Sequence, residues 1–285
     1  MKKNTLMGAF LIAFTMGITP LKAQEDILKT VLDIVSPVDI SDLIKKQGIK
    51  YDKTMLSNHV NFAAYKSDFK RALNLGIYST DMGYSTINEQ SKDALSFLGS
   101  VKKTAEALKV GQFIDSGKMM MLAANKKDIN KLLEETTTTF ENISDYLDKQ
   151  KKPSLAALMI TGGWLETFHI TCQVAQKQSD KKVKEELNTK IVTQKIVLEK
   201  ILEALKPYSD KDIVKLRSDL SGLSKLLEKY KIEQESGTAG EVKEENGLIT
   251  TTGNNSSKDV EITQEELKKI AESVTSIRSS IMSIK

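Results

Sequence analysis

The chain has 285 residues, of which 28% are charged and 40% hydrophobic, and its formal net charge is +4 at neutral pH. Three lysines and no acid lie in the first 23 residues, so the remainder carries only +1. This balance, with Lys and Glu mixed along each segment, gives little reason to expect a nucleic-acid partner. One cysteine, Cys172, excludes an internal disulfide. Abundant Leu, Lys, Glu, Ala and Ile, without strand-like alternation, indicates an all-α fold.

The N-terminal segment, residues 1–23, has the pattern of a secretory signal peptide. Lys2 and Lys3 precede an uncharged, largely apolar run that ends before Leu21-Lys22-Ala23. The run of about fifteen residues is shorter than the roughly twenty that cross a bilayer, so we expect cleavage after Ala23. The sequence therefore predicts a periplasmic protein that starts at Gln24 and has no transmembrane span after cleavage. An uncleaved N-terminal anchor is the alternative.

Apolar residues spaced three and four apart predict a helical bundle over residues 24–232. Gln194 is the one polar residue in an otherwise apolar row of its segment. We expect one elongated, mostly antiparallel bundle of about six or seven helices. Its clearest amphipathic segments, in chain order, are residues 93–109, 128–149, 187–205 and 213–230.

A change of composition sets residues 233–262 apart from the bundle. Glycine, Ser, Thr, Asn and Glu dominate there, so we expect a flexible tether. Residues 263–285 then form an apolar stripe that opens with a capping box at Thr263 and Glu266. A flexible chain of that length spans on the order of 30 Å, so the last helix can dock on the same bundle. A final helix that binds a partner instead is the alternative.

Two segments lack a charged face and are predicted to be the central helices. Asp81 is the only charged residue between positions 71 and 89, and Glu166 is the only one between positions 152 and 177. A helix without a charged face is surrounded by other helices. The two segments should therefore lie in the middle of the bundle, each with a single acid.

Glycines in these two segments indicate that the helix backbones approach closely. Gly76 and Gly83 lie seven residues apart in the first segment, and Gly162 and Gly163 are adjacent in the second. Glycine costs a helix about 1 kcal/mol relative to alanine, so its presence favours close packing.

Asp81 and Glu166 are the main candidates for a site. A buried carboxyl group must be protonated, paired with a cation or hydrogen-bonded. We expect Arg278 of the last helix, or Arg71, to neutralise one of the two acids, because arginine binds carboxylates through two bonds. Side chains at helical spacing supply further polar groups. The predicted polar or ligand-binding cluster comprises Asn74, Tyr78, Asp81, Tyr84, Trp164, Glu166 and Arg278.

The sequence predicts no metal site, no cofactor and no catalytic residue. Glu166 and His169 have the Glu-x-x-His spacing that supplies half of a ferritin-like di-iron site. The other half is missing, because Leu56 stands three residues before His59, the only other histidine. We therefore interpret His169 as a packed core residue. The glycines at 111 and 117 have five intervening residues where a phosphate loop has four.

Parts of the sequence resemble a group of exported all-helical proteins of Bacteroidota-type bacteria. The resemblance is carried by residues 72–78 with Asp81 and Tyr84, and by residues 163–166. A cut between Ala23 and Gln24 is also common in the exported proteins of those bacteria. The resemblance implies a location in the cell envelope and a helical fold, and it implies no substrate.

Two functions are consistent with these patterns. In the first, the protein is a non-enzymatic binding or scaffold protein, with a protein or small-molecule partner in the cell envelope, and the two acids hold the core together. In the second, it is a small-ligand receptor or enzyme with a cleft between the central helices around Asp81 and Glu166. A pocket that connects both acids to solvent would favour the second function, and a dry, satisfied cluster the first.

Overall fold

The computed structural model describes residues 47–124, 129–230, 242–245, 248–251 and 261–284, so the predicted signal peptide at 1–23 lies outside the described residues. The described chain has the predicted all-α fold. Seven of its eight α-helices match predicted segments, and the short α5 is additional. The helices are α3 (Asp68–Ile87), α4 (Ser91–Ala107), α5 (Ser116–Ala124), α6 (Ile129–Lys149), α7 (Pro153–Lys177), α8 (Lys181–Leu205), α9 (Lys211–Leu227) and α10 (Gln264–Met282). Three short 3-10 helices, η1 (Lys53–Met55), η2 (His59–Ala64) and η3 (Gly111–Phe113), lie in connections.

Side-chain caps mark where several helices begin. The Ser67 hydroxyl accepts the backbone N–H of Lys70 at the start of α3, and Asp180 caps α8 in the same way. Thr263 and Glu266 form the predicted capping box, in which each side chain accepts a backbone N–H of the other residue. Such caps satisfy donors that the first turn of a helix leaves free.

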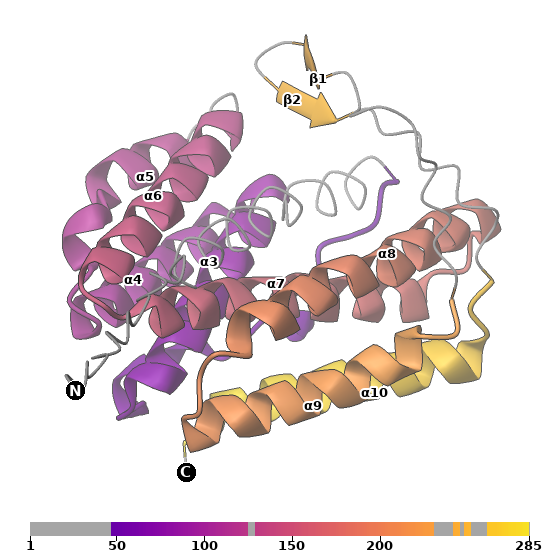
Figure 1. The fold of residues 1–285 in the computed structure, drawn as a ribbon. Coiled ribbons are helices and arrows are strands. Elements are labelled where there is room, and N and C mark those ends of the chain that lie inside the picture. The colour runs from indigo at the N-terminus through magenta and orange to yellow at the C-terminus, as the bar shows by residue number, and fades with distance from the viewer. Residues whose placement is uncertain (1–46, 125–128, 231–241, 246–247, 252–260, 285) are drawn as a thin grey trace, which may run out of the picture.

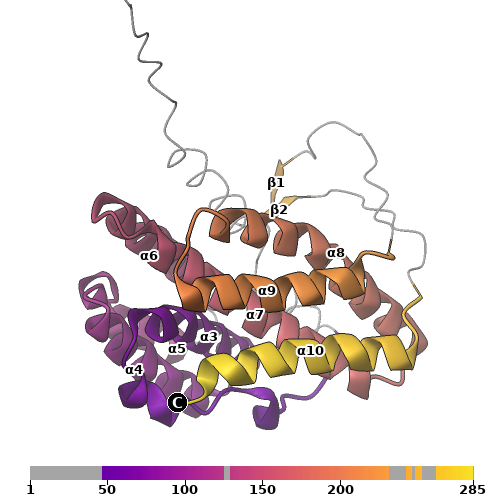
Figure 2. The same ribbon diagram turned by 60° about the horizontal axis from the view of Figure 1, so that its bottom comes forward.

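Helix α7 lies at the centre of the bundle. It packs against α3, α6, α8 and α10. Figures 1 and 2 both show it between α3–α6 on one side and α8–α10 on the other. In α3, every residue from 72 to 87 is buried, as is nearly every residue of α7 from 155 to 175. The two charge-poor segments are therefore the central helices, as predicted.

The last helix returns to the bundle and runs antiparallel to α7. Thr275 lies beside His169, whereas Arg278, one turn later, lies beside Glu166, one turn earlier. α10 also packs along α9, as Figure 2 shows. A helix remote in the sequence thus covers one face of the central pair.

Part of the predicted tether forms a small β-hairpin. Strands β1 (Val242–Glu245) and β2 (Leu248–Thr251) pair antiparallel, with Val242 opposite Thr251. These strands were not predicted from the sequence. The dipeptide Asn-Gly at positions 246–247 is the one that two-residue hairpin turns prefer. Most other residues of 233–262 lie outside the described residues.

The central helices α3 and α7 touch through their backbones. A Cβ atom on Gly76 would lie 2.0 Å from the carbonyl oxygen of Met159, and one on Gly162 would lie 2.0 Å from that of Leu73. Close approach is therefore confirmed at Gly76 and Gly162. The expectation was wrong for Gly83, because a Cβ atom there would meet nothing within 4 Å.

The contacts along this seam also define the direction of the two helices. Leu73 meets Gly162, and the Thr80 hydroxyl donates to the carbonyl of Gly163 at 3.1 Å. Asp81 meets Glu166 further along both helices. Residue numbers rise together, so α3 and α7 run in the same general direction, an exception within a mostly antiparallel bundle.

Gly76→Ala and Gly83→Ala form a matched pair of substitutions in the same buried helix. We expect Gly76→Ala to lower the free energy of unfolding by about 3 kcal/mol, because its methyl group would collide with the α7 backbone. Gly83→Ala should instead raise it by up to about 1 kcal/mol through better helix propensity. Urea unfolding followed by circular dichroism measures both values. If both substitutions lowered the free energy of unfolding by similar amounts, that result would contradict close backbone contact between α3 and α7 at Gly76.

Candidate functional site

Glu166 of α7 is held by a two-pronged ion pair with Arg278 of α10. Nε of Arg278 lies 2.5 Å from Oε2 of Glu166, and a terminal guanidinium nitrogen lies 2.6 Å from Oε1. Glu166 is fully buried and Arg278 is 9% exposed. This arrangement confirms the predicted role of Arg278 and matches the planar fork of the guanidinium to the carboxylate. Arg71 instead binds Asp68 at 3.0 Å.

Asp81 of α3 is the second buried acid and lies against Glu166. The backbone N–H of Ser57 donates to Oδ2 of Asp81 at 3.0 Å, and the Ser57 hydroxyl donates to the same oxygen. Asp81 lies close enough to Glu166 for the Glu166 charge to raise the pKa of Asp81. The other carboxyl oxygen of Asp81, Oδ1, is buried and has no hydrogen-bond partner among the described residues.

A short turn before α3 brings Ser57 to Asp81. Asp52 caps η1 by accepting the backbone N–H of Thr54 at 2.9 Å, and the chain then becomes extended at Leu56. This geometry also turns the carbonyl of Met55 inward, where Arg278 donates to it at 3.3 Å. The segment therefore supplies one donor residue and one acceptor to the buried acids and the arginine.

His169 completes the network one turn after Glu166 on α7. Its Nδ1 atom lies 3.3 Å from the hydroxyl of Thr275 on α10, and its ring lies near the carbonyl of Met55. We call Ser57, Asp81, Glu166, His169 and Arg278 the buried charge network. It joins the segment after η1 to α3, α7 and α10.

Burial decides the protonation states in this network. It raises the pKa of Asp81 well above its usual range, and the nearby Glu166 raises that pKa further. Burial lowers the pKa of His169 to about 4, although the Glu166 charge opposes this effect. His169 is therefore neutral at neutral pH, and the burial of Asp81 favours its protonated form beside the Glu166–Arg278 ion pair.

The structure brings only part of the predicted cluster together. Tyr78 lies near both acids, and its pKa is raised, first by burial and then by its contact with Tyr65. Asn74 donates instead to the carbonyl of Lys70 at 2.8 Å. The remaining two predicted residues point elsewhere: the ring of Tyr84 stacks on Tyr51, and the indole of Trp164 donates to Gln194 of α8 at 2.9 Å.

Sequence reasoning missed Ser57, the Met55 carbonyl and Tyr65 as partners. The Tyr65 hydroxyl donates to the carbonyl of Met282 at 3.0 Å and ties the end of α10 to the segment before α3. These residues follow no helical period, and no charge pattern distinguishes them. Gln194 carried a usable signal, because a polar residue in an apolar row requires a partner.

The described part of the chain contains no group of three or more His, Cys, Asp or Glu side chains that could hold a metal ion. Glu166 is bound to Arg278, and His169 lies within hydrogen-bond distance of Thr275, so their spacing does not create a ligand pair. Burial raises the pKa of Cys172, which keeps its thiol protonated and unreactive.

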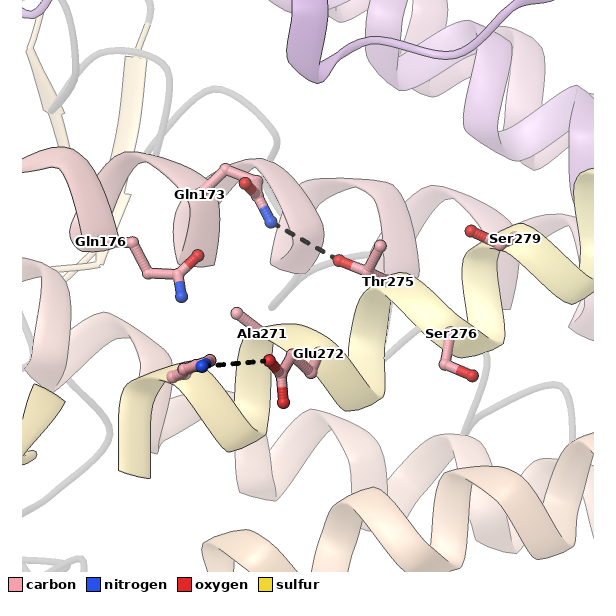
Figure 3. A pocket seen from close by; sticks show the side chains of 8 residues that line it. Gln173, Gln176, Ala271, Glu272, Thr275, Ser276 and Ser279 are labelled. Carbon is pink, nitrogen blue, oxygen red and sulfur yellow. Dashed lines mark hydrogen bonds and ion pairs between the residues drawn. The ribbon is translucent and has the colours of Figure 1, made fainter. Parts of the chain in front are cut away.

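Figure 3 shows a hollow of about 540 Å³ between α7 and α10. Gln173 and Gln176 extend over it from α7, while Ser276 and Ser279 lie along α10. Gln173 reaches Thr275 at 3.5 Å. A second hollow of about 310 Å³ lies at the end of α7 beside Asp52 and Lys177. Neither hollow is lined by Asp81 or Glu166.

Comparison with known proteins adds no family to this description, because no protein-family model, no curated protein and no solved structure matches the chain. Among the described residues, no helix has both the length and the apolar character of a membrane span. The chemistry of the site must therefore be argued from its own geometry.

The Glu166–Arg278 pair should show strong coupling in a double-mutant cycle. Glu166→Gln and Arg278→Met should each lower the free energy of unfolding by about 3–5 kcal/mol, because each leaves a buried group without its partner. The double variant should lose much less than the sum of the two. Breaking the exposed Lys215–Asp219 pair by Asp219→Asn should cost less than about 1 kcal/mol. Additive losses at the buried pair in urea unfolding would contradict this account.

Proposed function

We propose that the protein is exported to the periplasm and acts there as a non-enzymatic binding or scaffold protein, with a protein or small-molecule partner in the cell envelope. One observation carries the non-enzymatic part of this proposal. Asp81 and Glu166, the acids best placed for chemistry, are fully buried and bonded to groups of the protein itself. Both oxygens of Glu166 and Oδ2 of Asp81 are thus used within the fold, whereas Oδ1 of Asp81 is buried without a hydrogen-bond partner among the described residues.

The alternative, a receptor or enzyme with a cleft between the central helices, fits the geometry less well. A catalytic acid or base must come within hydrogen-bond reach of its substrate. Along the α3–α7 seam, however, even a methyl group at Gly76 or Gly162 would collide with backbone atoms. The described hollows lie outside this seam and away from both acids.

The hollow between α7 and α10 is the described surface best suited to a polar partner. Its amide and hydroxyl groups, from Gln173, Gln176, Thr275, Ser276 and Ser279, can both donate and accept hydrogen bonds. Lys268 and Glu272, which pair with each other at 3.8 Å, also line the hollow. The neutral groups match the backbone of a polypeptide or another polar surface. The firm docking of α10 on α7 holds the two rows of groups at a fixed spacing.

Export can be tested by determining where the N-terminus of the protein lies when it is isolated from its own host. The basic, apolar and small-residue pattern of residues 1–23 predicts that the mature chain begins at Gln24 in the periplasmic fraction. Edman sequencing of protein from fractionated cells determines the start. As a control, Ala23→Asp should block cleavage and leave the longer chain. A wild-type chain that keeps Met1 in the cytoplasm would contradict export.

Native mass spectrometry of the protein purified from its host can distinguish a partner bound in the hollow from a ligand bound at the two acids. We expect wild type and Asp81→Asn to retain the same partner, because Asp81 faces no described hollow. Gln176→Ala, in the hollow between α7 and α10, should weaken a partner bound there. A small molecule that is lost from Asp81→Asn and kept by Gln176→Ala would contradict the proposal and support a cleft at the acids.

A further inference from the structure

We propose that Ser96 of α4 is a nucleophilic hydroxyl that accepts a phosphoryl group from a small activated phosphate, with His59 as its general base. Neither residue belongs to the buried charge network, and neither lines the described hollows. Transfer to a serine of the chain is a single covalent modification without turnover. The proposal is therefore compatible with a non-enzymatic protein, and it is independent of export and of any partner.

Three side chains form a hydrogen-bonded row between η2 and α4. Nε2 of His59 lies 3.3 Å from the hydroxyl oxygen of Ser96, and Nδ1 lies 3.0 Å from that of Ser100. The two serines are four residues apart in α4, so helical spacing places both hydroxyls on the side that meets His59. Ser96 is exposed, whereas Ser100 is buried. The imidazole therefore links an interior hydroxyl to one that solvent reaches.

Packing against α4 holds the imidazole of His59 in place. Its ring lies on Phe97, with the two ring centroids 4.4 Å apart. Phe97 is fully buried and precedes Ser100 by one turn of α4. A second contact joins the same two elements, because Nζ of Lys103 lies 5.0 Å from the ring centroid of Phe62 in η2. The orientation of His59 thus does not depend on its bonds to the two serines alone.

The bonds of Ser100 determine which ring nitrogen of His59 carries the proton. The Ser100 hydroxyl donates to the carbonyl of His59 at 3.3 Å or to that of Ser96 at 3.5 Å. Since a carbonyl takes its single proton, the Ser100 oxygen can only accept a bond from the ring. Nδ1 must then carry the ring proton, which leaves the lone pair of Nε2 to accept the proton of Ser96. A serine bonded in this way to an oriented base has the arrangement of an activated nucleophile.

His59 must be uncharged to act as a base. Burial lowers its pKa below the ordinary value of 6.5, and the charge of Lys53 lowers it further, whereas the charge of Asp93 raises it. Asp93 is itself paired with Lys53 and accepts a hydrogen bond from the Tyr51 hydroxyl at 2.9 Å, so part of its charge is compensated. At neutral pH the imidazole is therefore in the form that can take a proton from a hydroxyl.

The surroundings of Ser96 favour phosphoryl transfer over acyl transfer. The oxyanion of an acyl intermediate requires free N–H donors, but the backbone N–H groups around Ser96 are used within α4. A phosphoryl group in transfer instead requires positive charge near its oxygens. Lys92 lies one turn before Ser96 and Lys103 lies two turns after it, on the same side of the helix, and both are exposed. These two lysines fit an anionic phosphoryl donor.

The surface beside Ser96 is open to a small molecule. Gly99 lies three residues after Ser96, and a Cβ atom there would meet nothing within 4 Å. In the reaction, Oγ of Ser96 bonds to phosphorus, and the bond from phosphorus to the leaving group breaks. The leaving group departs with the electron pair of that bond, and the hydroxyl proton passes to Nε2 of His59 and then to water. With acetyl phosphate as the donor, the leaving group is acetate.

Incubation of the full chain with acetyl phosphate, followed by phosphopeptide mapping, tests the site. We expect phosphate on Ser96 in preference to Ser91, an exposed serine at the start of the same helix. His59→Gln should slow the modification of Ser96 by about a hundredfold, because it removes the base. The wild-type rate should exceed half of its plateau at pH 6.5, since the pKa of His59 lies below this value. No phosphate on Ser96, or equal rates in wild type and His59→Gln, would overturn the proposal.

Lys92→Gln separates the role of charge from the role of the base. With anionic acetyl phosphate this variant should react up to about fivefold more slowly, because an exposed cation contributes modestly. Labelling of Ser96 by an uncharged fluorophosphonate, which needs the same base and no cation, should keep its wild-type rate. Equal effects of Lys92→Gln on the two reagents would contradict the preference for an anionic donor.

Nitrogen-15 NMR of the imidazole rings tests the positioning role of Ser100 without any reagent. In wild type at neutral pH, the proton of His59 should lie on Nδ1. In Ser100→Ala it should move in part to Nε2, and the phosphorylation of Ser96 should slow in step. His169 serves as an internal reference, because its ring contacts Thr275 of α10. A proton on Nε2 of His59 in wild type, or no change in Ser100→Ala, would overturn the assigned roles.

Discussion

The bundle depends on neutralising two carboxyl groups where no water reaches them. Asp81 and Glu166 sit on the two central helices, and the described ion pairs of these helices' own cations lie elsewhere, such as that of Arg71 with Asp68. The chain meets this constraint by returning with α10, which carries Arg278, and by folding the segment after η1 inward to present Ser57. Buried ion pairs add little net stability compared with apolar residues of similar size, whereas breaking one is costly. We therefore interpret the network as what specifies which helix covers α7 and in which register.

Helix α7 makes two kinds of contact with its neighbours. On the side of α3, glycines allow the backbones to touch, which fixes the distance between the helices by shape alone. On the side of α10, side chains carry the contact, and an ion pair within an apolar stripe fixes the register. A seam built from backbone atoms depends on shape, whereas one built around an ion pair depends on keeping both charged partners in place.

Much of the centre could be predicted from the sequence, because charge and helical period report burial directly. The absence of charge around Asp81 and Glu166 predicted the two central helices, and the two-bond geometry of arginine predicted Arg278 or Arg71 as a partner. Helical spacing was a poorer guide to contacts, since it shows which residues share a face but not what that face meets. Asn74, Tyr84 and Trp164 therefore turned out to bind Lys70, Tyr51 and Gln194. Ser57 and the Met55 carbonyl could not be predicted, because their role comes from the geometry of an irregular turn.

The placement of the acids also limits where a function can reside. A partner that binds across α7 and α10 would contact amides and hydroxyls beside Lys268 and Glu272, and it would bind only while α10 is docked. Binding to the docked state stabilises that state, so such a partner would also stabilise the buried Glu166–Arg278 pair that joins the two helices. A buried network without catalytic access can thus still govern what happens at the surface.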